Sequence, residues 1–246
     1  MTVLAKDHRP WHGLVVHQPQ AGYRFSQDAL LLAAHADPKP GERVLELGAG
    51  CGIVSLILAL RHPGIEIVGV EVQPALARLA EKNSAENGFT RRISMLCQDM
   101  KTLRPEMCGG PFDMVVSNPP YRPTSAGRIN LHSQRAVARH EISITLPELV
   151  STAKTMLRPG GRLMLIYPNE RLGELFAQLT KAKIGLQWLR FIHSRTDREA
   201  RLAISAAKNG GPSKLRVRPP LILYSEPGVY TPEAASILKN HALRTE

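Results

Sequence analysis

Aromatic side chains are scarce in this chain, since Phe, Trp and Tyr together make up 5% of its 246 residues. Proteins that bind single-stranded nucleic acids without sequence preference stack successive bases on aromatic rings. The composition therefore argues against a broad stacking surface. It leaves open the docking of one splayed-out base on one ring, which needs few aromatics.

Cysteine and long apolar runs are also in short supply. Only Cys51, Cys97 and Cys108 are present, without C-x-x-C spacing, which argues against a disulfide scaffold and a zinc site. No stretch approaches the roughly 20 apolar residues of a membrane span, and the first residues lack the apolar core of a signal peptide. We therefore expect a reduced, cytoplasmic protein without metal or membrane contact.

Acidic residues are outnumbered by basic ones, 21 Asp and Glu against 32 Lys and Arg, which leaves a formal charge of +11. An excess of this size favours a polyanionic partner that is held through phosphate contacts. A protein that is merely basic is the alternative, and charge does not separate RNA from DNA.

Strand-like and helical patterns alternate through the middle of the chain. The predicted strands are residues 43–47, 65–70, 93–97, 112–117 and 162–167, and the predicted helices are residues 27–36, 52–60, 74–87, 146–157 and 169–181. This alternation is typical of a parallel sheet with helices on both faces. We predict an N-terminal arm and helix at residues 1–40 and one α/β domain at residues 41–246.

The C-terminal part follows a different pattern. Residues 186–194, 200–207 and 220–224 resemble strands joined by turns without a crossover helix. Consecutive strands of this kind usually pair antiparallel, so we predict an antiparallel edge on a mostly parallel sheet. Residues 231–238 are predicted to form a terminal helix.

A glycine-rich loop, Gly48-Ala49-Gly50-Cys51-Gly52, follows the first predicted strand of the domain. Two cofactor classes use such loops. A dinucleotide-binding loop requires a third glycine where this chain has Ile53. The acidic Glu46 just before the glycines suits a ligand with a cationic amino group and no pyrophosphate, and S-adenosylmethionine is such a ligand.

Two more polar positions follow the next two predicted strands. Glu71 lies roughly 20 residues past the glycines, where a carboxylate can accept hydrogen bonds from both ribose hydroxyls. Asp99 and Met100 can bind an adenine amino group and pack on its ring. Alone, Glu71 would be a solvated strand end and Asp99 a helix cap. Together, at the carboxyl ends of consecutive parallel strands, they predict a cofactor site.

The fourth predicted strand ends in Asn118-Pro119-Pro120-Tyr121. The two prolines stiffen the backbone, so the Asn118 side-chain oxygen and the Pro119 carbonyl can both accept from one amino group. Tyr121 offers a ring on which a planar acceptor stacks. This arrangement predicts direct methyl transfer to a weakly nucleophilic nitrogen, without a metal or a covalent enzyme intermediate. A rigid loop without function is the alternative.

These motifs resemble the class I methyltransferases with an NPPY motif, which methylate adenine N6, guanine N2 or the glutamine side-chain amide. The resemblance covers roughly residues 22–167. Residues 22–31, 221–224 and 228–231 are similar to the tRNA(Val) (adenine-37-N6)-methyltransferase family. The resemblance implies a Rossmann-like fold with a mostly parallel seven-stranded sheet, helices on both faces and an antiparallel C-terminal edge.

The resemblance also assigns roles to residues. Those expected to bind S-adenosylmethionine are Tyr23, Phe25, Ser26, Glu46, Gly48, Ala49, Gly50, Gly52, Glu71, Val72, Asp99, Met100 and Asn118. For Tyr23 and Phe25, plain packing is the alternative. The expected catalytic residues are Asn118, Pro119, Pro120 and Tyr121.

An arginine-rich segment follows the NPPY motif. Tyr121 is expected to hold the base, and Arg122, Arg128, Arg135 and Arg139 are expected to contact substrate phosphates. A solvated helix start is the alternative. Residues 122–133 match no member of the family closely, which leaves the acceptor open.

The favoured acceptor is an adenine N6 in RNA, with a tRNA anticodon loop as the best candidate because an unpaired base splays out at low cost. A protein glutamine methyltransferase and a ribosomal RNA guanine-N2 methyltransferase are the enzymatic rivals. An inactive RNA-binding module is the rival from another class, although both motifs are intact. The sequence does not distinguish a monomer from a homodimer.

Overall fold

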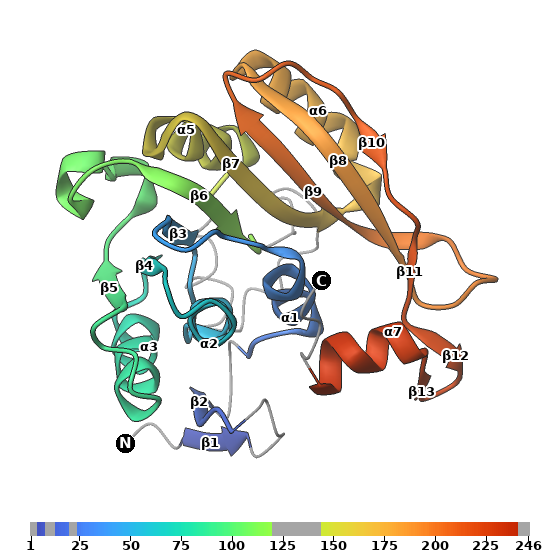
Figure 1. The fold of residues 1–246 in the computed structure, drawn as a ribbon, viewed down its shortest axis with the longest axis horizontal. Helices are drawn as coiled ribbons and strands as arrows, with labels where there is room; N and C mark the ends of the chain where they lie inside the picture. The colour runs from blue at the N-terminus through green and yellow to red at the C-terminus, as the bar shows by residue number, and fades with distance from the viewer. Residues whose placement is uncertain (1–3, 8–12, 20–23, 120–143, 241–246) are drawn as a thin grey trace, which may run out of the picture.

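A computed structural model of the chain describes residues 4–7, 13–19, 24–119 and 144–240. Its centre is a nine-stranded sheet in which β10, β8, β9, β7, β6, β3, β4 and β5 follow one another and β11 also pairs with β8 (Figure 1). The strands are β3 (Arg43–Leu47), β4 (Glu66–Glu71), β5 (Ile93–Cys97), β6 (Phe112–Ser117), β7 (Leu157–Pro168), β8 (Ile184–His193), β9 (Ala200–Asn209), β10 (Arg216–Val217) and β11 (Leu221–Ile222). Seven long strands therefore form the predicted sheet, and β10 and β11 are two-residue additions.

Helices cover both faces of the sheet, as the alternating pattern predicts (Figure 1). They are α1 (Gln27–His35), α2 (Ile53–Arg61), α3 (Pro74–Glu86), α5 (Leu146–Met156) and α6 (Leu172–Lys181), with short turns at Met100–Thr102, Pro105–Cys108 and Asn169–Arg171. Successive strand residues point to opposite faces. Val44 accordingly packs in the core with α1 and α2, and Leu45 packs in the core with α5 and α6.

The strands β3 to β7 all run in the same direction, because each neighbouring pair among them is parallel. Their carboxyl ends therefore lie along one edge of the sheet. In open α/β sheets this edge is where ligands bind, beside the point at which the strand order reverses. Here the chain continues from β3 to β4 and β5 on one side, and then crosses to β6 and β7 on the other side of β3.

The C-terminal edge is antiparallel only in part. As predicted, β9 is antiparallel to both β7 and β8. A strand is present within residues 220–224, but its predicted antiparallel pairing is wrong, since β11 pairs parallel to β8, with Leu221 opposite Ile192. The reason is that β9 lies between β7 and β8. The chain that leaves β9 must turn back along the outer edge of β8, where Lys214 N–H donates to the Leu186 carbonyl at 3.0 Å.

The two ends of the chain add small elements around the helix layer. At the N-terminus, β1 (Leu4–Asp7) pairs antiparallel with β2 (Val16–Pro19), and Leu14 and Val16 are buried in the core with α1 and α2. At the C-terminus, β12 (Tyr224–Glu226) pairs with β13 (Val229–Tyr230). The predicted terminal helix is present as α7 (Pro232–Ala235), continued by a π-helical turn at Ser236–Asn240.

Gly185, at the start of β8, offers a test of this edge. A Cβ atom there would lie 2.2 Å from the Gly211 carbonyl oxygen and 2.6 Å from the Pro212 backbone, which cannot move away as a side chain would. Gly185→Ala is expected to lower the free energy of unfolding by about 1–3 kcal/mol. Thermal and urea unfolding measure the change.

Gly173→Ala is the matched control. Gly173 is exposed in α6, and a Cβ atom there would meet none of the described residues within 4 Å. Because glycine is a poor helix former, this change is expected to stabilise the protein by roughly 0.5–1 kcal/mol. If the two variants were equally stable, the backbone of residues 211–212 could not lie as close to Gly185 as the structure has it.

Candidate active site

The glycine loop between β3 and α2 has a backbone that only glycine adopts easily. Gly48, Gly50 and Gly52 have φ angles of 76°, 58° and 83°, in the left-handed region where a Cβ atom causes strain. At Gly52 the restriction is also one of space, since a Cβ atom there would lie 3.1 Å from the Cβ of Ala80 on α3. The loop therefore turns sharply and lies close against α3.

Two buried acidic side chains bind the loop and the first turn of α2. The Glu71 carboxylate, at the end of β4, accepts from the backbone N–H of Gly50 at 2.9 Å and of Gln73 at 2.9 Å. The Glu46 carboxylate, on β3, accepts from the backbone N–H of Ser55 at 3.0 Å and from the Ser55 hydroxyl. Only 4% of Glu46 and 6% of Glu71 are exposed, so both depend on these donors.

Burial raises the pKa of Glu46 to about 8. Removal of the carboxylate from water is the largest cause; the two hydrogen bonds from Ser55 oppose it, and the negative charge of Glu71 adds to it. Burial therefore favours the protonated form of Glu46 in the free protein. A cationic group placed beside it would favour release of that proton.

Apolar surface flanks the polar part of the site. Val72, directly after Glu71, is 38% exposed and offers an apolar side chain at the end of β4. Among the described residues, a Cβ atom built on Gly48 would meet only the Cε of Met100, at 3.8 Å. Asp99 caps the short helical turn by accepting from the Lys101 N–H at 2.9 Å. The helix-cap alternative for Asp99 is thus real, and its side chain stays 42% exposed.

The first half of the NPPY motif lies beside the glycine loop. Ser117, the last residue of β6, is opposite Leu47 of β3, and its hydroxyl donates to the Leu47 carbonyl at 2.7 Å. Asn118 and Pro119 follow at once, with Asn118 partly buried and Pro119 buried. The carboxyl ends of β3, β4 and β6 thus bring Glu46, Glu71 and Asn118 to one edge of the sheet.

Several predicted site residues lie outside the described part of the chain: Tyr23, Pro120, Tyr121, Arg122, Arg128, Arg135 and Arg139. Of the remaining predictions for the N-terminal segment, Phe25 is buried in the core with α1 and α2, and Ser26 is exposed just before α1. Packing thus accounts for the Phe25 side chain.

Sequence reasoning missed two polar residues that support the site. Ser55 binds Glu46, and Asn83 on α3 donates to the Cys51 carbonyl in the glycine loop at 2.9 Å. Both are buried polar residues on the apolar face of a helix. A Ser within an otherwise apolar helix, and an Asn on the buried stripe of α3, are signals that would have identified them.

No cluster of three or more His, Cys, Asp or Glu side chains within the described ranges is arranged to hold a metal ion. Nor is any helix of those ranges long and apolar enough to cross a membrane.

Comparison with known proteins identifies the family. The family model of the methyltransferase small domain matches residues 23–182, well over half of the chain. The chain belongs to this family. It is therefore a methyltransferase with S-adenosylmethionine as its cofactor, and the prediction of fold, enzyme class and cofactor is confirmed.

Individual relatives of this methyltransferase agree with the family. A tRNA1(Val) (adenine(37)-N6)-methyltransferase of Porphyromonas gingivalis (strain ATCC 33277) is 31% identical over 232 residues, which cover 89% of this chain and 88% of that protein. A protein of the same name from Shewanella loihica is 30% identical over 202 residues, 81% of this chain and 77% of that protein. Among solved structures, a predicted O-methyltransferase from Agrobacterium tumefaciens superposes with a TM-score of 0.68 at 25% identity, over 85% of this chain and 94% of that one.

The raised pKa of Glu46 predicts how the stability of the cofactor-free methyltransferase depends on pH. Between the ordinary carboxyl value of 4.5 and about 8, the folded state holds a proton that the unfolded state has lost. The contribution of Glu46 to the free energy of unfolding therefore falls as pH rises through this window and levels off above it.

Glu46→Gln keeps the shape of the side chain and cannot ionise. Its stability relative to the natural protein is expected to increase from pH 5 to pH 8, by an amount on the order of 1 kcal/mol or more. Urea unfolding at a series of pH values measures the difference. A difference that does not change with pH would show that Glu46 ionises normally.

Proposed function

We propose that this methyltransferase transfers a methyl group from S-adenosylmethionine to the exocyclic N6 amino group of an adenine in tRNA, of the anticodon-loop adenine-37 type. The observation that carries the proposal is the position of Asn118 and Pro119. The Ser117 hydroxyl bond to Leu47 places them at the edge where the glycine loop and Glu71 meet. The names of the relatives from Porphyromonas gingivalis and Shewanella loihica support the choice of acceptor.

The site suits the cofactor in charge and in shape. S-adenosylmethionine supplies an activated methyl group on a sulfonium centre. Glu71 has unused lone pairs for the ribose hydroxyls, because each of its oxygens accepts one bond from the protein. Val72 and Met100 offer apolar surfaces for the adenine ring, and Asp99 an acceptor for its amino group. Glu46, on ionisation, would complement the cationic amino group at the other end.

A dinucleotide cofactor fits this loop poorly. A pyrophosphate needs free backbone N–H groups at the loop and at the start of the following helix. Here Gly50 N–H and Ser55 N–H already donate to carboxylates, and the N–H groups of Gly48 and Ala49 donate to the Val70 carbonyl. A nicotinamide dehydrogenase is therefore not the function that the loop favours.

An amino group is the acceptor that Asn118 and Pro119 suit best. Two hydrogen-bond acceptors can bind both hydrogens of an amino group and raise the electron density on a nitrogen whose lone pair is delocalised. A hydroxyl acceptor has only one hydrogen and can donate to only one of the two. This argument favours a nitrogen acceptor over an oxygen acceptor, although the structural relative from Agrobacterium tumefaciens is named a predicted O-methyltransferase.

RNA is the substrate class that the charge favours. The formal charge of +11 supports phosphate contacts, and Arg122, Arg128, Arg135 and Arg139 stay candidates for them, with Tyr121 as the surface for the base. An unpaired loop base is the simplest target, because it needs no disruption of a duplex. A tRNA acceptor would place the reaction in the cytoplasm.

The experiment uses the full-length protein, unmodified tRNA and S-adenosylmethionine with an isotopically labelled methyl group. Digestion and mass spectrometry are expected to detect N6-methyladenosine, and a tRNA with guanine at position 37 is expected to gain none. Label in guanosine would show that the acceptor is a guanine, and label in a release-factor glutamine would show that it is a protein side chain; either result would contradict the adenine assignment.

Asn118→Ala is expected to lower turnover by about 100-fold or more while it retains cofactor binding, since it removes an acceptor that acts on the reacting nitrogen.

Glu71→Ala tests the cofactor half of the proposal. It removes the ribose acceptor and leaves the Gly50 and Gln73 N–H groups without their partner. The dissociation constant for S-adenosylmethionine is expected to rise about tenfold or more, as measured by calorimetry. Glu106→Ala, in an exposed 3₁₀ turn away from the site, is the control. Unchanged affinity in Glu71→Ala would show that Glu71 does not bind the ribose of the cofactor.

A further inference from the structure

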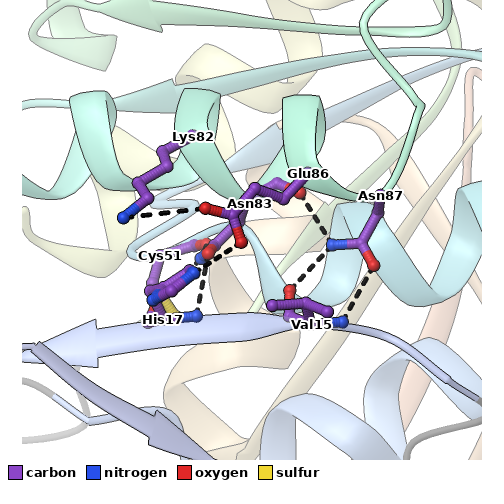
Figure 2. A network of polar contacts seen from close by, with 7 residues as sticks. All are labelled: Val15, His17, Cys51, Lys82, Asn83, Glu86 and Asn87. Atoms are coloured by element: carbon purple, nitrogen blue, oxygen red, sulfur yellow. Dashed lines mark hydrogen bonds and ion pairs between the residues drawn. The ribbon is translucent and has the colours of Figure 1, made fainter.

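Asn83, on α3, connects the N-terminal strand to the glycine loop. Its side chain is fully buried, and its Nδ2 donates both to the His17 carbonyl on β2 and to the Cys51 carbonyl in the loop, each at 2.9 Å (Figure 2). Its Oδ1 accepts from the His17 N–H at 2.8 Å. One side chain thus binds two segments that are far apart in sequence.

Asn87, the residue that caps the carboxyl end of α3, binds the same N-terminal segment in the same way. Its Nδ2 donates to the Val15 carbonyl at 2.7 Å and its Oδ1 accepts from the Val15 N–H at 2.9 Å (Figure 2). Its remaining bond goes to the Asn83 carbonyl, within its own helix. Asn87 therefore holds the segment before β2 without a bond to the glycine loop.

The Cys51 carbonyl is a sensitive point of the loop. It belongs to the peptide between Cys51 and Gly52, and the residues on both sides of Cys51 have left-handed φ angles. Glycine restricts its own backbone little, so contacts from outside must select the loop conformation. Glu71 supplies one such contact at Gly50 N–H, and Asn83 supplies another at the next residue.

We infer that Asn83 is a positioning residue for cofactor binding, which orients the glycine loop through the Cys51 carbonyl and is itself held by strand β2. The inference rests on the proposed role of the glycine loop in binding S-adenosylmethionine. Asn83 acts through the loop backbone and needs no contact with the cofactor.

The test compares Asn83→Ala with Asn87→Ala in the full-length protein. Both variants lose the bonds to the N-terminal segment, so both are expected to unfold at a lower temperature. Only Asn83→Ala loses the bond to Cys51. Its dissociation constant for S-adenosylmethionine is expected to rise about five- to tenfold, whereas that of Asn87→Ala stays within about twofold. Calorimetry with S-adenosylmethionine measures both.

Steady-state kinetics separate positioning from general loss of structure. In Asn83→Ala the KM for S-adenosylmethionine is expected to rise while kcat at saturation stays close to that of the natural protein. Equal affinities in the two variants would overturn the inference, because Asn83 would then be only a strand contact. A natural protein that binds no S-adenosylmethionine would instead overturn the proposed function.

A second pair of variants covers the case in which Asn83→Ala does not fold. Asn83→Leu and Asn87→Leu keep the side-chain volume and remove the polar atoms, which is often tolerated better than a cavity. The same criterion applies: weaker binding of S-adenosylmethionine only in Asn83→Leu supports the inference, and equal binding overturns it.

Discussion

The carboxylate of Glu71 accepts hydrogen bonds from the backbone N–H groups of Gly50 and Gln73, and so ties the end of β4 to the loop that follows β3. The candidate site depends on this interaction, because a loop rich in glycine selects no conformation by itself. It is possible only because β3 and β4 are parallel neighbours whose carboxyl ends meet at the same edge. The sheet order therefore determines where the loop lies, and the loop determines where a ligand can approach the backbone.

The same geometry brings a second buried acid close to the first. Glu46 lies on the neighbouring strand, and burial together with the charge of Glu71 raises its pKa to about 8. In water-poor surroundings two adjacent carboxylates do not both ionise readily. A ligand that carries positive charge and donates hydrogen bonds relieves this repulsion, whereas a pyrophosphate adds to it. The electrostatics of the fold thus favour the same ligand class as the family assignment.

The features that can be predicted from the sequence are those with a local signal. The strands β3 to β6, the glycine loop and Glu71 follow from apolar runs, closely spaced glycines and a fixed spacing, and the structure has them where the sequence predicts them. The parallel pairing of β11 has no such signal, because it results from the position of β9 between two other strands. The contacts of Asn83 with His17 and Cys51 likewise join segments 66 and 32 residues apart. Only the packed fold brings these together.

The supports of the glycine loop therefore come from two different layers of the fold. Glu71 reaches Gly50 from the sheet, and Asn83 reaches Cys51 from the helix layer, at adjacent residues of the loop. Ala80, on the same helix, leaves little room for a side chain at Gly52. A loop held in this way keeps its conformation only while α3 and β4 keep their relative position. The N-terminal segment is bound to α3 by Asn83 and Asn87, although it lies outside the central sheet and its sequence carries no motif, and only through Asn83 does it share a side chain with the glycine loop.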